Sequence, residues 1–395
     1  MKRRDTHMKK KILAALLAAV LLLGVLAGCA AKTDTAASSQ QTPAASASAA
    51  QSAAASASAS ASASAAASAS ASAAQTEAGG SCAPGKSCDQ NQPITKPVIN
   101  LAGLKGPTSI GMVGLLSNAE QQLTKNDYTF QMGGSADELT PLFIKGELDI
   151  LAAPINLASV LYSKMDGGAE LLAVNTLGVL YVVEKGGETV TDMKSLKGQT
   201  IYATGKGATP EYTLRYLLSQ NGLDPDKDVT IEFFSEPTEI VAKMAAEDHV
   251  IAMLPQPYVV VAQGKVDGLR VALDLTQEWD KLNNGSRLIT AGLLVRKAFL
   301  DENPQAVADF LTEYAASVDY VNKNVDEAAQ LVEKYDIVKA AVAKAAIPYC
   351  NIVCITGDEM KTDVQGYLGI LYGQNPKAVG GALPADDFYY MGSAS

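Results

Sequence analysis

The sequence predicts an α/β protein with two lobes, each built on a mainly parallel sheet flanked by helices. From residue 97 onward, apolar strands alternate with amphipathic helices, a pattern typical of parallel sheets. A strand that runs through a glycine-containing turn into a helix start occurs twice, at residues 98–112 and 199–212. The two turns share the order Lys-Gly-x-Thr, at residues 105–108 and 206–209. Two such units predict two lobes that face each other across a cleft.

The first 29 residues are interpreted as a lipoprotein signal peptide and are excluded from the fold. Basic residues precede an apolar run over residues 12–26, which at about 15 residues is too short to span a membrane comfortably as a helix. The run closes on the sequence Leu-Ala-Gly-Cys, which resembles the lipobox of bacterial lipoproteins. By that resemblance, Cys29 is lipidated and becomes the mature N-terminus. An ordinary signal peptide with an incidental cysteine is the alternative.

Residues 30–96 are rich in Ala and Ser and contain almost no large apolar side chains. Such a segment cannot bury enough surface to offset its chain entropy, so we interpret it as a flexible tether. Cys82 and Cys88 flank a short loop in it and are able to form a disulfide in an oxidising compartment. Residues 80–87 satisfy the phosphate-loop pattern, but no strand precedes them and no helix follows, so the match is accidental.

The remaining part of the chain is acidic and poor in catalytic residue types. Of the 32 Lys and Arg residues nine lie before residue 97, and of the 42 Asp and Glu residues four do, which leaves a net charge of about −15. This charge argues against nucleic acid and against a polybasic membrane contact. His249, the only histidine beyond residue 29, is expected in a surface turn. Cys350 and Cys354 are expected to be buried or partly buried thiols, and no metal or cofactor is expected.

The predicted elements divide the chain into lobes that are not contiguous in sequence. The first lobe takes residues 97–186 and 288–395, and the second lobe takes residues 187–287. Gly186-Gly187 marks the first crossover, and a strand over residues 287–295 returns the chain to the first lobe. Two crossovers form a hinge, as in clamshell proteins that close around a ligand.

Local patterns predict where several helices begin and end. One helix is expected over residues 109–125, and another begins with Thr209 as N-cap and Pro210 in the first turn. In the C-terminal part, helices are expected over residues 304–323, 325–334 and 337–346, a capping box at residues 356–359 opens the last helix, and a tail over residues 378–390 wraps a lobe.

Four stretches carry a resemblance to a known family: residues 146–154 (GELDILAAP), 196–218, 255–258 and 293–311. With the lipobox and the tether, they make the chain similar to the substrate-binding lipoproteins of ABC importers. More narrowly, it resembles the nitrate/sulfonate/taurine and thiamine-pyrimidine-precursor branch of the type II periplasmic binding fold. At residues 104–108 the chain departs from the glycine-rich loop and aromatic motif usual in that branch, so no particular substrate follows.

The resemblance implies capture of a small polar or anionic organic solute between the lobes, without chemistry. It implies delivery to ABC permease subunits by a monomer that is lipid-anchored at the outer face of the cytoplasmic membrane. The mapped ligand-binding residues are Pro107, Thr108, Ser109, Asn156, Asn175 and Thr176 from the first lobe, and Lys206, Gly207, Ala208, Thr209, Glu236 and Gln256 from the second.

Several roles stay open from sequence alone. Lys105 and Lys206 either pair with an anionic group or are exposed beside their turns. Trp279 either lines the mouth of the cleft or is a packed residue of a helix. One alternative function is an enzyme on the same fold, as in the menaquinone pathway, for which Glu236 is the candidate base. A ligand-sensing lipoprotein without a transporter is the other alternative.

Overall fold

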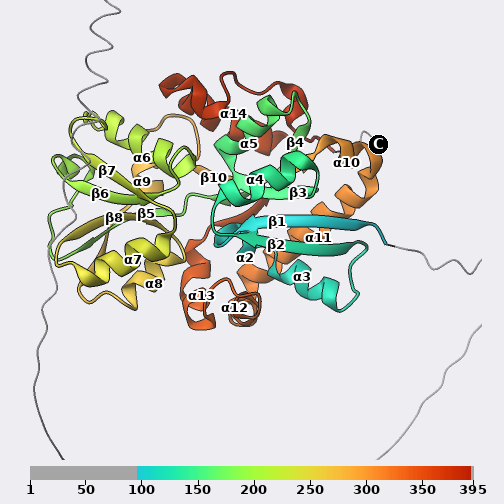
Figure 1. Ribbon diagram of the computed structural model, residues 1–395, viewed down its shortest axis with the longest axis horizontal. Coiled ribbons are helices and arrows are strands. Elements are labelled where there is room, and N and C mark those ends of the chain that lie inside the picture. Colours follow the sequence, from blue (N-terminus) through green and yellow to red (C-terminus); the bar gives the residue numbers. More distant parts are fainter. Residues whose placement is uncertain (1–95, 393–395) are drawn as a thin grey trace, which may run out of the picture. The chain divides into compact units, whose positions relative to one another are not determined.

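The computed structural model describes residues 96–392 of the chain (Figure 1). The predicted signal peptide with Cys29, the tether up to residue 95, the cysteines at positions 82 and 88 and the phosphate-loop-like segment lie outside the described residues. Within the described part, no helix combines the length and the apolar character that crossing a membrane requires.

The first lobe is built on a six-stranded sheet with the strand order β11-β4-β10-β3-β1-β2. Strands β1 to β4 run in one direction, and β10 and β11 run in the opposite direction. Four of the six strands are thus mutually parallel, in agreement with the predicted mainly parallel sheet. The strands are β1 (Val98–Leu104), β2 (Asp127–Gly133), β3 (Ile150–Pro154), β4 (Ala169–Leu177), β10 (Ile289–Arg296) and β11 (Ile352–Ile355).

The second lobe is built on a five-stranded sheet with the order β7-β6-β8-β5-β9. Here β5 alone runs against its neighbours, because it pairs antiparallel with β8 and β9 while β6 pairs parallel with β7 and β8. The strands are β5 (Leu180–Lys185), β6 (Thr200–Thr204), β7 (Thr230–Phe234), β8 (Val250–Pro255) and β9 (Leu269–Asp274).

The first crossover lies one strand earlier than the sequence predicts. Strand β5 belongs to the five-stranded sheet, so the chain changes lobes between Leu177 and Leu180 and not at Gly186-Gly187. A strand's apolar pattern does not reveal which sheet it joins, so the sequence alone places the boundary after β5. The second crossover agrees with expectation, since β10 returns from the second lobe into the first sheet.

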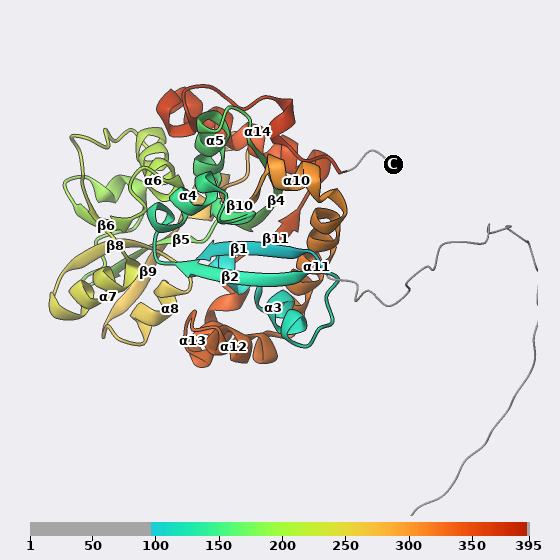
Figure 2. The same cartoon turned by 45° about the vertical axis from the view of Figure 1, so that its right-hand side comes forward.

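Two groups of helices pack on the first sheet, and their buried side chains form two separate clusters (Figures 1 and 2). One cluster includes side chains of α4 (Ala136–Lys145), α5 (Ile155–Lys164) and α14 (Gly357–Gln374). The other cluster includes side chains of α2 (Pro107–Ile110), α3 (Val113–Glu120), α10 (Lys297–Glu302), α11 (Pro304–Lys323), α12 (Val325–Lys334) and α13 (Ala340–Ala346). The expected single helix over residues 109–125 is therefore two shorter helices. The chain breaks at Gly111, where a Cβ would lie only 2.8 Å from Tyr314 Oη.

The second lobe contains α6 (Thr209–Gln220), α7 (Pro237–Ala246), α8 (Tyr258–Gln263) and α9 (Leu275–Asp280). Helix α6 begins at the expected place, but its N-cap is Ala208 and not Thr209. The Thr209 hydroxyl instead donates a hydrogen bond to Asn156 Oδ1 of the first lobe. The expected N-cap is wrong by one residue because that hydroxyl has a long-range partner.

The C-terminal segment holds the two lobes together and wraps the first. Trp279 of α9 is fully buried between Tyr216 of α6 and Tyr367 of α14, with ring centroids 4.9 and 5.3 Å apart, so it is a packing residue. Helix α14 begins where expected, but Thr356 makes no side-chain cap, and Glu359 pairs with Arg287. The expected tail packs on the first lobe, where Phe388 is buried and Tyr390 N–H donates to Leu171 O.

A buried ion pair fastens the returning strand to the first sheet. Arg296, the last residue of β10, donates from Nη2 to Asp149 Oδ1 at 2.6 Å. The other carboxylate oxygen, Oδ2, accepts from the backbone N–H and the side-chain amide of Asn100 on β1. Because the Asp149 side chain is only 5% exposed, this carboxylate needs all of these donors.

We predict that Asp149→Ala lowers the free energy of unfolding by about 3 kcal/mol, because it leaves the Arg296 charge without its counterion. Urea denaturation monitored by circular dichroism measures this loss. The control is Asp319→Ala, which breaks a pair with Lys323 whose side chains are 70% and 71% exposed. That change should cost no more than about 0.5 kcal/mol. Equal losses in the two variants would contradict a structural role for the buried pair.

Candidate functional site

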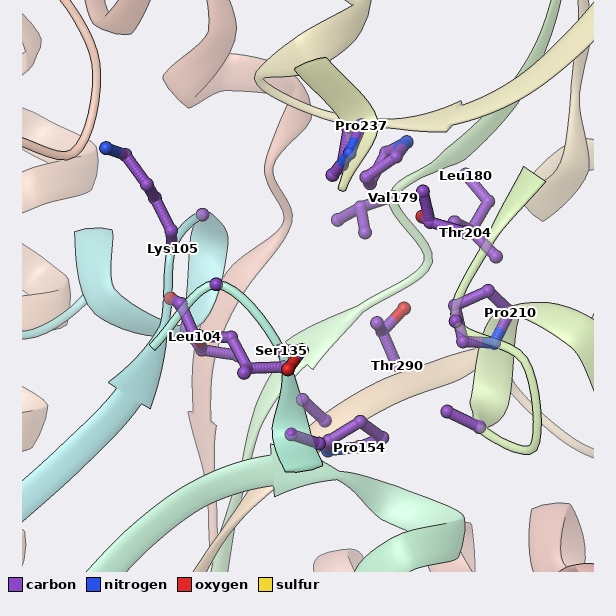
Figure 3. Close-up of a pocket in the computed structure, with 18 of the residues that line it drawn as sticks. Leu104, Lys105, Ser135, Pro154, Val179, Leu180, Thr204, Pro210, Pro237 and Thr290 are labelled. Carbon is purple, nitrogen blue, oxygen red and sulfur yellow. The ribbon is translucent and has the colours of Figure 1, made fainter. Parts of the chain in front are cut away.

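A cavity of about 490 Å³ lies between the two lobes, at the carboxyl ends of strands from both sheets (Figure 3). Leu104 and Pro154 end β1 and β3 on one side, and Thr204 and Pro255 end β6 and β8 on the other. Ligands of open α/β sheets bind beyond the carboxyl ends of the strands, and small-molecule sites typically measure roughly 300–1,000 Å³. Position and size therefore both identify this cavity as the candidate site.

The walls of the cavity are mostly apolar. Two aromatic residues, Phe233 and Phe234, come from the end of β7, and aliphatic residues come from the first crossover and from α5. Tyr258, at the start of α8, adds a third aromatic ring. Burial, together with the nearby charge of Glu236, raises the pKa of Tyr258 to about 12, so its phenol stays protonated at neutral pH. The apolar wall residues include Leu157, Val179, Leu180, Phe233 and Phe234.

Three polar side chains in the cavity have buried oxygen atoms without a hydrogen-bond partner in the described part of the chain. These atoms are Thr176 Oγ1 on β4, Gln256 Oε1 after β8 and Thr290 Oγ1 on β10. Figure 3 shows Thr290 between Pro154 of the first lobe and the Val179 crossover. Buried polar atoms are almost always paired, so three unpaired oxygens around one cavity indicate where a ligand or ordered water would bind.

Seven of the twelve residues mapped from sequence line the cavity, and five do not. The lining residues are Pro107, Thr108, Thr176, Lys206, Gly207, Ala208 and Gln256. The residues outside the lining are Ser109, Asn156, Asn175, Thr209 and Glu236. Ser109 is fully buried, and its hydroxyl donates to Leu104 O at 2.6 Å, which turns it away from the cavity.

Asn156 and Thr209 connect the two lobes to each other. The Asn156 amide donates to Gly207 O in the second lobe at 3.2 Å and to Ala378 O in the tail at 3.0 Å. Its Oδ1 accepts from the Thr209 hydroxyl at 3.1 Å. Both side chains are buried, so their polar atoms are used to position the second-lobe turn that lines the cavity.

Asn175 and Glu236 lie behind and beside the cavity, respectively. Asn175 is fully buried, and its side chain lies beside the buried phenol of Tyr314. Glu236 is exposed at the N-cap of α7, and its Oε1 would lie 2.7 Å from a Cβ placed on Gly134 of the first lobe. A carboxylate at this exposed lip is outside the lining, so Glu236 is not the buried general base that the enzyme alternative requires.

At three of the helix starts around the cavity, those of α4, α6 and α7, a carboxylate of the chain itself accepts backbone N–H groups. Glu138 accepts from the backbone N–H groups of Gly134 and Ser135 in front of α4. Glu211 accepts from Gly207 N–H in front of α6, at 2.7 Å. Glu239 accepts from Ser235 N–H in front of α7, at 3.2 Å. Sequence reasoning missed these residues, although each is a glutamate three positions after the N-cap, which is the spacing of a capping box.

The two lysines of the repeated turn are both exposed. Lys105 directly follows β1, whereas Lys206 is the second residue of a longer turn after β6, so the sequence repeat does not correspond to a structural repeat. Figure 3 shows the Lys105 side chain directed away from Thr290 and Pro154. Its ammonium group therefore lies at the rim of the cavity and not among the buried oxygens.

Cys350, Cys354 and His249 lie outside the cavity lining. Cys350 is buried and Cys354 partly buried, and both are free thiols, which confirms the prediction. Burial raises the pKa of Cys350 to about 12 and that of Cys354 to about 11, so neither thiol forms a reactive thiolate at neutral pH. His249 is exposed just before β8, in agreement with a surface turn.

Two sheet-based lobes with a cavity across their strand ends define the class of two-lobed solute-binding folds. The sequence profile of the NMT1-like family matches residues 129–334, about half of the chain. The chain therefore belongs to the NMT1-like family. Among curated proteins, no sequence matches this chain.

Solved structures show the same fold. An ABC transporter from Parabacteroides distasonis is 26% identical, with a TM-score of 0.62 over 75% of this chain and 99% of that one. The periplasmic aliphatic sulphonate binding protein SsuA from Escherichia coli is 15% identical, with a TM-score of 0.62 over 76% of this chain and 94% of that one. The ligand binding component of an ABC-type import system from Staphylococcus aureus is 16% identical, with a TM-score of 0.60 over 75% of this chain and 97% of that one.

We predict that Thr176→Val does not destabilise the ligand-free protein and stabilises it by up to about 1 kcal/mol, because it removes a buried hydroxyl that has no partner. The matched control is Thr213→Val. That change removes a buried hydroxyl that pairs with Tyr367 Oη at 2.9 Å and should cost about 1–3 kcal/mol. Thermal unfolding of the two ligand-free variants makes the comparison. Similar losses in both would show that Thr176 has a structural partner and is not free for a ligand.

Proposed function

We propose that this chain is the solute-binding component of an ABC importer and that it captures a small polar or anionic organic solute between its lobes. The observation that carries the proposal is the cavity itself. It is walled by both lobes, and three buried oxygens in it have no protein partner within the described residues. Apolar walls with a few unpaired polar groups are the usual composition of a small-molecule site.

Membership of the NMT1-like family and the fold of the neighbouring structures support this role. The Escherichia coli neighbour is described as a sulphonate binding protein, and the Staphylococcus aureus neighbour as a ligand binding component of an import system. We propose correspondingly that this chain is a monomer and delivers its solute to a permease.

The proposed ligand contacts are the seven mapped residues that line the cavity, together with Thr290 and Tyr258. Asn156 and Thr209 would affect ligand binding indirectly, because they position the second-lobe turn that lines the cavity. We further propose that the lobes rotate about the two crossovers, near residues 178–179 and 281–288, when the solute binds.

We also propose that Cys29 is lipidated and anchors the protein at the outer face of the cytoplasmic membrane. The apolar run before Cys29 and the Leu-Ala-Gly-Cys sequence support this proposal. The Ala/Ser-rich segment would then hold the solute-binding part away from the membrane surface.

We predict that at least one solute from a panel of sulfonates, nitrate, pyrimidines, flavins and amino acids stabilises the full chain. At 100 times its dissociation constant, a ligand adds roughly 2.7 kcal/mol to the free energy of unfolding. For a folded part of this size, that corresponds to an increase in melting temperature of about 5 °C. Differential scanning fluorimetry measures the increase, and the absence of any increase across the panel would contradict the proposed function.

A pair of tryptophan variants controls for binding elsewhere on the protein. Ala208→Trp fills the cavity from the turn before α6, where the extended backbone accepts a large side chain, and should abolish the increase in melting temperature. Ala315→Trp adds the same side chain at an exposed position of α11 and should retain it. If both variants lose the increase in melting temperature, or if both retain it, the increase does not report binding of the solute in the cavity.

We predict that Cys29→Ser abolishes incorporation of labelled fatty acid and shifts the protein from the membrane fraction to the soluble fraction of a bacterial host. Cys88→Ser, in the proposed tether, should leave labelling and fractionation unchanged. Labelling that survives Cys29→Ser would overturn the lipidation proposal and leave the solute-binding proposal intact.

A further inference from the structure

The turn between β6 and α6 lines the cavity with consecutive residues from Gly205 to Ala208. It contains two glycines with positive φ values, 78° at Gly205 and 73° at Gly207. Glycine loses more conformational freedom on folding than any other residue, so such a turn does not hold one conformation by itself. Within the turn, Ala208 N–H donates to Gly205 O. Bonds from outside the turn supply the rest of the order of this cavity wall.

The backbone of Gly207 is held from two sides. Its N–H group donates to Glu211 Oε2 of α6 at 2.7 Å, and its carbonyl oxygen accepts from the Asn156 amide of the first lobe at 3.2 Å. One residue of the turn therefore carries a bond to its own helix and a bond to the other lobe. A displacement of Gly207 would change the cavity wall and the contact between the lobes together.

The carboxylate that holds Gly207 N–H depends on a partner of its own. Glu211 is only 9% exposed, and its second oxygen, Oε1, accepts from Arg215 Nε at 2.8 Å. A buried carboxylate that has lost its counter-charge is costly. The Arg215 guanidinium therefore allows Glu211 to stay beside Gly207 and not to turn toward water.

Arg215 connects this buried bond to the surface of the second lobe. It lies four residues after Glu211 on α6, its side chain is 27% exposed, and it is not part of the cavity lining. Its Nη1 donates to the exposed Asp226 at 2.8 Å, which fixes the guanidinium from the opposite side. Charge-assisted hydrogen bonds are stronger than neutral ones, so the series Asp226, Arg215 and Glu211 holds Gly207 N–H firmly.

Resting on the proposed function, we infer that Arg215 is a positioning residue for solute binding. It does not touch the solute. It keeps the Glu211 carboxylate in the place where that group binds Gly207 N–H, and so keeps the turn in the conformation that lines the cavity and contacts Asn156 of the first lobe.

The first test needs no solute. Amide hydrogen exchange of Gly207, followed by NMR on the full chain with selectively labelled glycine, measures how firmly its N–H group is held. Arg215→Met keeps an unbranched side chain and removes the guanidinium. It is expected to speed exchange at Gly207 by at least about tenfold, because Glu211 without its counter-charge turns toward water.

A double variant separates the charge of Arg215 from its packing. Glu211→Gln combined with Arg215→Met leaves an uncharged acceptor beside Gly207 that needs no counter-charge. Exchange at Gly207 should then return to within about threefold of the unmodified chain. If the double variant exchanges as fast as Arg215→Met alone, Arg215 acts through the packing of its apolar stem, and the inference is overturned.

Lys243→Met is the matched control in the same lobe. Lys243 is 26% exposed and pairs with Glu247 four residues further along α7, and neither residue lines the cavity. Exchange at Gly207 should stay unchanged in this variant. Equal acceleration in Lys243→Met and Arg215→Met, or no acceleration in Arg215→Met, would overturn the inference.

The second test adds solute. Differential scanning fluorimetry compares the unmodified chain, Arg215→Met and the double variant with taurine, nitrate, cytosine, riboflavin and glycine, one probe for each class of the panel above. A probe at about 100 times its dissociation constant loses roughly half of its stabilisation when its affinity falls tenfold. Any increase in melting temperature seen with the unmodified chain should therefore be at most half as large in Arg215→Met and should recover in the double variant.

The outcomes separate this inference from the proposed function. An equal increase in the unmodified chain and in Arg215→Met would overturn the inference and leave the solute-binding function intact. If no probe raises the melting temperature of the unmodified chain, the proposed function is contradicted, and with it the role of Arg215 in solute binding. Exchange at Gly207 still decides in that case whether Arg215 fixes the turn.

Discussion

Insertion of β10 between β3 and β4 is the constraint on which the rest of the structure depends. Because β10 arrives from the second lobe, it enters the first sheet antiparallel to both neighbours, with Thr290 and Ala291 at the cavity and Arg296 at the far end. The strand approaches its neighbours so closely that a Cβ on Gly292 would lie 2.7 Å from Leu171 Cδ1. One strand thus completes the sheet, links the lobes and supplies part of the cavity.

The lobes are also joined by packing, which limits how they can move. One hydrophobic cluster continues from α5 and α14 of the first lobe to α6 and α9 of the second. The hydrogen bonds of Asn156 and the pair of Thr213 with Tyr367 lie at the same junction. The proposed closure would therefore be a rotation of packed lobes and not a docking of two separate bodies. In that case, much of the cavity would exist before the solute arrives. A preformed cavity reduces the ordering cost of binding.

The parts of the fold that depend on local pattern were predictable from the sequence. The helices over residues 304–323 and 325–334 have the expected bounds because apolar residues at helical spacing determine them locally, and a proline marks the start of the first. Long-range pairing was not predictable. The apolar pattern of β5 is the same whichever sheet it joins, and the four residues of β11 are recognisable as a strand only beside β4. The N-cap of α6 shifted because Thr209 has a partner in another lobe.

The candidate site shows the same division between local and long-range information. The turns after β1 and β6 were found from sequence, but Thr176 and Thr290 become neighbours only through the order β4-β10, and Thr290 was not expected at the site. A helix start attracts anions, and a carboxylate of the chain itself at the same place weakens that attraction. Glu138, Glu211 and Glu239 stand three residues after their caps, a spacing that is visible in the sequence. The motif that marks these three helix starts also shows that a carboxylate of the chain lies at each of them. Helix α5 begins between the lining residues Pro154 and Leu157 and has no acidic residue in its first turn, so the helix starts around the cavity differ in local charge.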